Sequence, residues 1–208
     1  MLDISLLLPF FFTSTILAFS PGPDNLFVLA QSAQNGRMAG FFVTLGLATG
    51  LLVHTAAVAF GLAAVVQTSV LAFTFLKLTG AIYLLYLAWQ AFKSAALTET
   101  QGMVPVLSHC NLYRRGIIMN LTNPKVSLFY MAFLPQFADP HRGSMMVQFF
   151  QLGGVFIIAT LQVFGAISLL AGSFGDKFRN SAFAQKCVHR VTGLVFIALA
   201  VKLVLSER

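Results

Sequence analysis

The chain has 208 residues, of which 58% are hydrophobic and only 9% are charged. A soluble domain of this length needs far more charge to coat its surface, so the composition predicts a membrane protein. The net charge of +7 comes from basic residues spread over short segments between apolar runs, without a basic stripe or a stacking platform. Nucleic acid is therefore not an expected partner.

Six apolar runs, each long enough to cross a lipid bilayer, predict an all-α membrane protein with six transmembrane helices. In chain order the runs cover residues 5–34, 39–66, 71–92, 116–137, 145–172 and 183–205. The first run is longer than a span requires, because proline residues interrupt it. A second interruption of the same kind lies in the fourth run.

The first break contains Pro21, Gly22, Pro23, Asp24 and Asn25. Proline removes a backbone donor and clashes with the preceding turn, so the helix is expected to break here and to restart near Asp24. Freed carbonyls and an acid suit an ammonium group or a proton, and the new helix end suits a carboxylate. We favour this role for Asp24 over simple helix capping, because acids inside a membrane are costly and usually functional.

The second break contains Asn120, Asn123, Pro124 and Lys125. Pro124 is expected to free the carbonyl of Asn120, and the two asparagine amides are expected to bond across the gap. A lysine at the bilayer centre costs about 2.5–3.5 kcal/mol unless it is paired or reaches water. We expect Lys125 to take part in substrate binding or coupling, with an ion pair to Asp24 or an interfacial position as the alternative.

Other residues inside the predicted spans are a histidine, which has a functional and a structural interpretation, and several glycines, which have a structural one. His54 lies in the middle of the second span and titrates near neutral pH, so proton relay and hydrogen bonding between helices are equally expected. Small residues are expected to let helices approach closely. They are Gly46 and Gly50 in the second span and Gly153, Gly154, Gly165 and Gly172 in the fifth.

The two halves of the chain repeat each other. Lys77-Leu-Thr-Gly-Ala-Ile-Tyr-Leu in the third span matches Arg190-Val-Thr-Gly-Leu-Val-Phe-Ile in the sixth, and the two proline breaks also correspond. Three spans in each half would insert the second copy upside down, and such inverted repeats are common in secondary transporters. We expect a first repeat over residues 1–95, a cytoplasmic connecting loop over 96–112 and a second repeat over 113–208.

Basic residues indicate how the chain is oriented. They gather in the segments around the ends of the odd-numbered spans, at Arg37, Lys93, Arg114, Arg115, Lys177, Arg179, Lys186 and Arg190. The other side has only Lys77, Arg142, Lys202 and Arg208. The positive-inside rule then predicts that the odd loops are cytoplasmic and that both termini are periplasmic or extracellular.

Several motifs in one order resemble the LysE/RhtB amino-acid exporter family over nearly the whole chain. They are Ser20-Pro-Gly-Pro-Asp-Asn, Gly36-Arg-x-x-Gly40, Lys77-x-x-Gly-Ala-x-Tyr-Leu-Leu-Tyr-Leu, Asn120-Leu-Thr-Asn-Pro-Lys-x-x-Leu-Phe, Phe133-x-Pro-Gln-Phe137 and Arg190-x-x-Gly-Leu-x-Phe. The resemblance implies a bacterial inner-membrane protein that exports amino acids or their derivatives and is driven by the proton gradient. By this resemblance, the family's two proline elements correspond in this chain to Pro21, Pro23, Asp24, Asn123, Pro124 and Lys125.

The charges favour a neutral substrate. Among the acids, only Asp24 is expected inside the membrane, and a dibasic amino acid would require a second acid. We therefore expect a threonine, homoserine or leucine type of substrate, with lysine, arginine or a metal cation as alternatives. Cadmium is disfavoured because neither Cys110 nor Cys187 lies deep in a span.

The expected partners are the amino acid, protons and the lipid bilayer, without a cofactor or a bound metal. A homodimer is left open. The chain shows no intramembrane protease constellation and no phosphate-binding loop, so an enzyme is not expected. A membrane-embedded scaffold is the non-transport alternative, but it would have no use for charged breaks in both halves.

Overall fold

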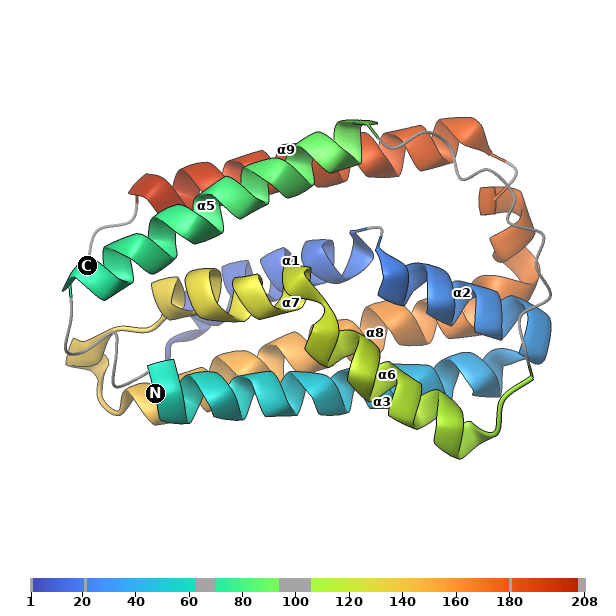
Figure 1. Ribbon diagram of the computed structural model, residues 1–208, viewed down its shortest axis with the longest axis horizontal. Coiled ribbons are helices and arrows are strands. Elements are labelled where there is room, and N and C mark those ends of the chain that lie inside the picture. Colours follow the sequence, from blue (N-terminus) through green and yellow to red (C-terminus); the bar gives the residue numbers. More distant parts are fainter. Residues whose placement is uncertain (1, 21, 63–69, 94–105, 180, 206–208) are drawn as a thin grey trace.

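The computed structural model describes residues 2–20, 22–62, 70–93, 106–179 and 181–205, and within these ranges the regular elements are all helical. The predicted all-α class is thereby confirmed. Pro21 lies outside the described residues. The α-helices, in chain order, are α1 (Ile4–Phe19), α2 (Pro23–Asn35), α3 (Arg37–Ala57), α5 (Val70–Lys93), α6 (His109–Thr122), α7 (Pro124–Leu128), α8 (Met145–Arg179) and α9 (Ala182–Leu205) (Figure 1).

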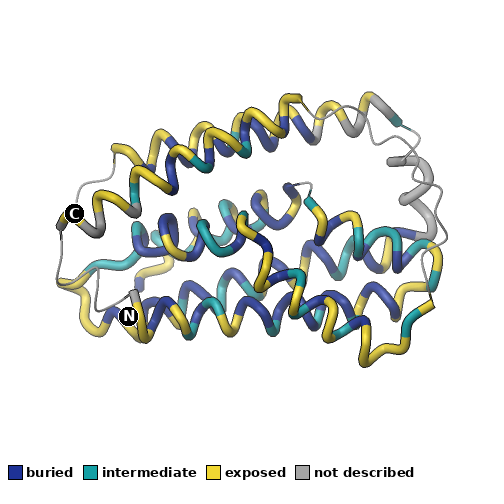
Figure 2. The backbone as a smooth tube through the Cα atoms, viewed as in Figure 1, coloured by how far each residue is buried: buried dark blue, intermediate teal, exposed yellow. Residues whose placement is uncertain are grey.

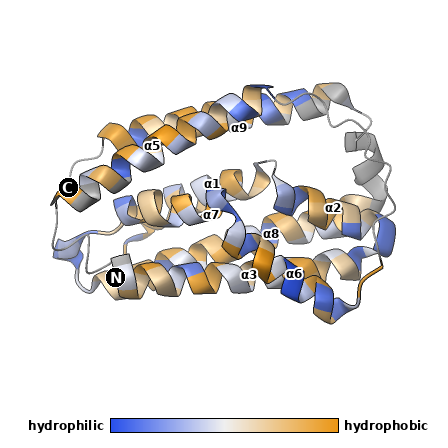
Figure 3. Ribbon diagram, in the orientation of Figure 1, coloured by the Kyte–Doolittle hydropathy of each residue, from blue (hydrophilic) through white to orange (hydrophobic). Residues whose placement is uncertain are grey.

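Two helices and one bent pair of helices are long and apolar enough to be membrane spans. Arg37–Gly61 and Met145–Ala171 are each long and apolar enough to cross a bilayer, and α1 with α2 passes the same test as a pair bent by 65°. Apolar residues dominate most helices in Figure 3. Many are exposed along α5 and α9, for example Phe75 and Leu194 (Figure 2). Such outward apolar side chains suit contact with lipid.

Two helix boundaries differ from the expected spans. The helix α6 begins at His109, ahead of the predicted start at residue 116 and inside the expected 96–112 loop, because Ser108 caps it. The Ser108 hydroxyl accepts a hydrogen bond from the Asn111 amide at 3.3 Å, which satisfies one of the free donors of the first turn. The helix α8 continues to Arg179, past the predicted end at residue 172.

The helices pack in two groups. The helix α3 lies against α6 and α8, and α2 and α1 pack on the same group. The helices α5 and α9 run side by side as a separate pair (Figure 1). This pair reaches the rest of the bundle mainly through the π-helical turn Phe129–Phe133, which follows α7.

Glycines set the closest helix contacts. A Cβ atom added to Gly46 would lie 2.1 Å from the carbonyl oxygen of Tyr113, and one added to Gly153 would lie 2.2 Å from the Thr55 hydroxyl. The predicted packing role is therefore confirmed for these residues and for Gly50, which contacts Asn120. It is wrong for Gly154 and Gly165 of α8, because nothing lies within 4 Å of a Cβ atom added to either of them. Gly172 lies outside the residues whose side chains the structure describes.

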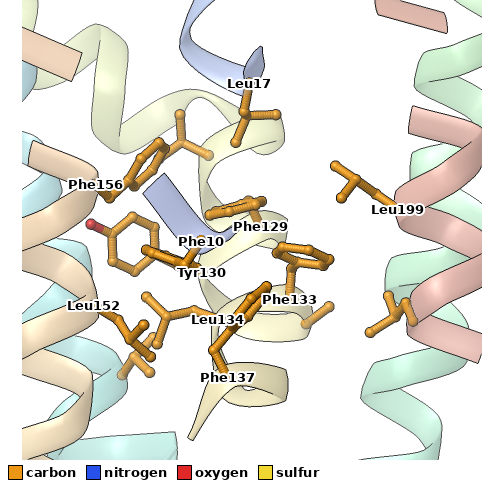
Figure 4. Packing of buried hydrophobic residues seen from close by; sticks show 14 of the residues in the cluster. Phe10, Leu17, Phe129, Tyr130, Phe133, Leu134, Phe137, Leu152, Phe156 and Leu199 are labelled. Atoms are coloured by element: carbon orange, nitrogen blue, oxygen red, sulfur yellow. The ribbon is translucent and has the colours of Figure 1, made fainter. Parts of the chain in front are cut away.

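Two apolar clusters stabilise the bundle on either side of the proline breaks. The larger one is rich in phenylalanine, and the ring centroids of Phe10 and Phe137 lie 5.0 Å apart (Figure 4). The smaller one joins α2, α3 and α8 around Val28. Leu17 belongs to the first cluster and Ala18 to the second, so the first break begins where the clusters meet.

We predict that Gly46→Ala destabilises the protein by about 1–3 kcal/mol, because the new methyl group would force α3 away from the α6 backbone. The matched control is Gly154→Ala, which adds the same methyl group where nothing lies within 4 Å. The thermal midpoint of the purified protein in detergent measures both. Equal midpoints for the two variants would show that α3 and α6 do not pack as closely as described.

Candidate functional site

The first break separates α1 from α2 and leaves Asp24 in the first turn of α2. The amide of Ser20 closes the end of α1 by bonding to the carbonyls of Ile16 and Leu17 at 2.9 and 3.2 Å. The residue at the N-cap of α2 is Gly22, which makes no side-chain cap. Asp24 therefore does not occupy the capping position that was the alternative to a functional role.

The second break lies directly against the first. Asn123 separates α6 from α7, and its side-chain oxygen caps α7 by accepting from the Lys125 amide at 3.0 Å. Its side-chain nitrogen donates to Oδ2 of Asp24 at 2.8 Å. These two residues are buried, with 4% of each surface exposed. A single asparagine thus orders the second break and binds the acid of the first.

Lys125 bonds to the backbone of the first break. Its Nζ atom donates to the carbonyl oxygen of Ser20 at 3.0 Å and makes a longer contact of 3.5 Å with that of Leu17. In the described part of the chain, ion pairs within 4.0 Å join Arg142 to Asp3 and to Asp139. Asp24 and Lys125 do not form one, so the alternative of a direct ion pair is not found between these two described residues.

Asn25 uses another carbonyl at the end of α1. Its Nδ2 atom donates to the carbonyl of Ala18 at 2.8 Å. A Cβ atom added to Gly22 would lie 3.3 Å from Nζ of Lys125 and 3.9 Å from Oδ1 of Asn25. The lysine ammonium and the asparagine oxygen therefore approach the same side of Gly22.

Several oxygen atoms at the breaks are buried and have no hydrogen-bond donor. They include Oδ1 of Asp24, Oδ1 of Asn25, Oδ1 of Asn120 and Oγ of Ser20. Buried polar atoms in folded proteins nearly always have a partner, and an unpaired one costs about 1–3 kcal/mol. The Oδ1 atoms of Asn25 and Asn120 can only accept, and so can that of Asp24 while the carboxylate is ionised. A ligand that satisfies them must therefore bring hydrogen-bond donors.

His54 joins the site through the backbone of the second break. Its Nε2 atom lies 3.4 Å from the carbonyl oxygen of Asn120. Its ring stacks on Tyr130 with centroids 5.4 Å apart, and the Tyr130 hydroxyl pairs with Oγ1 of Thr55 at 3.1 Å. The Asn120 carbonyl also accepts a hydrogen bond from the Asn123 amide at 3.1 Å, so the described contacts place His54 beside the second break.

Sequence reasoning had not selected Ser20, Thr55 and Tyr130 as site residues. Ser20 stands inside the first proline motif, and Tyr130 follows the second break by less than two helical turns. Their positions next to the breaks were the available signal. Thr55 adjoins His54, but in the sequence it looks like an ordinary threonine of a membrane helix. Its contact with Tyr130 could be recognised only in the structure.

The chain is similar to a family model described as LysE type translocator over residues 15–207, which includes both breaks. A homoserine/homoserine lactone efflux protein of Salmonella typhimurium is 33% identical over 185 residues, covering 89% of each chain. A leucine efflux protein of Salmonella choleraesuis is 32% identical over 191 residues, covering 88% of this chain and 87% of that protein.

An uncharacterized membrane protein of Vibrio cholerae is 29% identical over 206 residues, covering 99% of this chain and all of its own length. No solved structure matches the chain. The family match covers most of the chain, and its relatives are efflux and membrane proteins. The chain therefore belongs to the LysE type translocator family, and it is a membrane transporter and not an enzyme.

Proposed function

We propose that the protein exports small neutral amino acids or their derivatives, of the threonine, homoserine or leucine type, in exchange for protons. The observation that carries this proposal is the set of unpartnered acceptor oxygens at the two breaks, on Asp24, Asn25 and Asn120. An α-ammonium group has three N–H donors and a positive charge. It supplies what these oxygens and the aspartate carboxylate lack.

The substrate carboxylate has two candidate partners at the same place. An ammonium such as that of Lys125 has three N–H donors, of which the described contacts use two on the carbonyls of Ser20 and Leu17. The third is available to an anion. The start of α2 adds backbone N–H groups and a positive helix end near Gly22, because no side chain caps it.

The buried charges favour a neutral amino acid. Asp24 is the one buried acid among the described residues, and it is needed for the α-ammonium. A lysine or arginine substrate would bring a second positive charge without an acidic partner, which is costly in a buried site. Relatives named for homoserine and leucine efflux agree with this choice.

Proton coupling follows from the two ligands that Oδ1 of Asp24 can take. In the proposed cycle, this atom binds the substrate ammonium when the carboxylate is charged and holds a proton after the substrate leaves. A protonated carboxyl can donate to an acceptor such as Asn25 or Asn120, so either state satisfies a buried group. His54 is a candidate to pass protons toward the second break.

The packing supports six spans arranged as an inverted repeat. The second helices of the proposed halves, α3 and α8, pack together, and so do the third helices, α5 and α9. Each of these pairs is antiparallel in Figure 1, as a two-fold axis in the membrane plane requires. We propose repeats over residues 1–95 and 113–208 joined by a cytoplasmic loop, in a bacterial inner membrane with both termini outside.

We predict that Asp24→Asn weakens amino-acid binding about 10- to 100-fold, because an amide cannot supply a charge-assisted bond to an ammonium. Efflux from proteoliposomes should then no longer respond to an imposed pH gradient. The control is Asp3→Asn, whose side chain is 65% exposed. Full proton-coupled efflux by Asp24→Asn would exclude this mechanism.

We predict that Lys125→Met abolishes efflux while the protein still reaches the membrane, because the substrate carboxylate loses its cation. Growth of an overexpressing strain on toxic concentrations of individual amino acids reports export, and a blot of the membrane fraction reports protein. Lys93→Met, at an exposed lysine over the Trp89 ring, is the control. Continued resistance in the Lys125→Met strain would rule out the assigned role.

A further inference from the structure

The buried face of α2 is polar along nearly its whole length. It consists of Asp24, Asn25, Val28, Gln31 and Ser32, which recur at helical spacing and point the same way. This face packs against α3 and α8. Polar groups in the interior of a membrane bundle are expensive and usually mark a path for substrate or ions. The face continues beyond the break site, toward the end of α2.

Gln31 is the unsatisfied member of this face beyond the break site. Its residue is fully buried, with an exposed fraction of 0%, and its Oε1 atom accepts from Nδ2 of Asn35 at 2.8 Å. Its Nε2 atom has no partner. Turning the amide around would set its nitrogen against the Asn35 nitrogen, which is also a donor, so the bond from Asn35 favours the orientation that leaves the N–H groups of Gln31 unpartnered.

The hydroxyl groups nearby do not fill this need. Ser32 donates to the carbonyl of Val28 at 2.6 Å, and Ser168 of α8 donates to that of Phe164 at 2.8 Å. Both hydroxyls crowd Gly40 of α3, where an added Cβ atom would lie 1.7 Å from Ser32 and 2.7 Å from Ser168. These hydroxyls are satisfied within their own helices. The Gln31 amide is therefore the group here that is left for a ligand.

An apolar barrier separates Gln31 from the break site. Val28 lies between them on the same face and is packed with Val43, Leu47 and Phe164. Seven residues of helix place Gln31 about 10 Å beyond Asp24 along the axis. The ammonium and carboxylate of one amino acid are much closer together than that. One substrate molecule therefore cannot contact both positions, and Gln31 belongs to a separate station.

We propose that Gln31 is a loading station, where its amide N–H groups hold the substrate carboxylate before the substrate passes Val28 to the break site. This inference rests on the proposed function and its orientation, which put this end of α2 in the cytoplasm. A basic group lies there, because Arg37 begins α3 just after α2 ends at Asn35. Its field favours arrival of an anionic group.

The first test compares Gln31→Met with Gln34→Met, which makes the same change at an exposed position of α2. Loss of one hydrogen bond should slow efflux from proteoliposomes about five- to tenfold, while the equilibrium binding constant at the break site stays within twofold of wild type. Gln34→Met should match wild type in both. Wild-type efflux by Gln31→Met would overturn the proposal.

The second test does not require Gln31→Met to fold normally. The exposed cysteines Cys110 and Cys187 are replaced by serine, and Ser32→Cys, which lies on the same buried face and leaves Gln31 intact, is labelled with a membrane-impermeant thiol reagent in inverted vesicles. We expect labelling from the cytoplasmic side that a transported amino acid suppresses. Leu152→Cys, fully buried in the larger apolar cluster, should stay unlabelled. Labelling of Ser32→Cys that the amino acid leaves unchanged would contradict the loading station.

The two proposals fail separately. If Asp24→Asn kept full coupled transport while the Gln31 tests gave the expected results, the assignment of the break site would be wrong and the loading station would stand. The reverse pattern, with Asp24 essential and Gln31 replaceable, would remove only the station.

Discussion

The hydrogen bond from Asn123 to Asp24 is the contact on which the site depends. It joins residues 99 positions apart in the chain and holds the two proline breaks against each other at 2.8 Å. A bond to a charged group contributes about 1.5–3 kcal/mol, which is less than the cost of burying an isolated carboxylate. The other oxygen of Asp24 remains unpartnered. The bond thus fixes the acid in place and leaves half of its binding capacity for a ligand.

At the breaks, the backbone carbonyls at the end of α1 have hydrogen-bond donors, whereas several side-chain oxygens do not. Lys125 bonds to the carbonyls of Leu17 and Ser20, and Asn25 bonds to that of Ala18, so the end of α1 is well supplied with donors. The side-chain oxygens of Asn25 and Asn120 have no donor. Lys125 therefore stabilises the broken helix, and the capacity to bind a cationic group lies in the side chains around Asp24. Substrate recognition and structural support are divided between different atoms of the same few residues.

Much of the architecture was predictable because each feature has a local cause. Long apolar runs predicted the helices, and proline with its missing amide predicted both breaks. The partner of Lys125 was not predictable, since an acid and a set of free carbonyls were both within reason and only the packing selects between them. Outward-facing Gly154 and Gly165 look identical in sequence to Gly153, which packs on Thr55. Gln31 resembled any polar residue near a helix end until its burial was known.

The central claim is that the substrate ammonium satisfies the oxygens around Asp24. Competition binding to the purified protein tests it most directly, with a neutral amino acid that the protein transports and two analogues of it. One analogue carries a hydroxyl in place of the α-ammonium, and the other is a methyl ester that keeps the ammonium and neutralises the carboxylate. We predict that the hydroxy analogue competes about 100-fold less well than the parent and that the ester loses less. Equal competition by the hydroxy analogue and the parent amino acid would contradict the account.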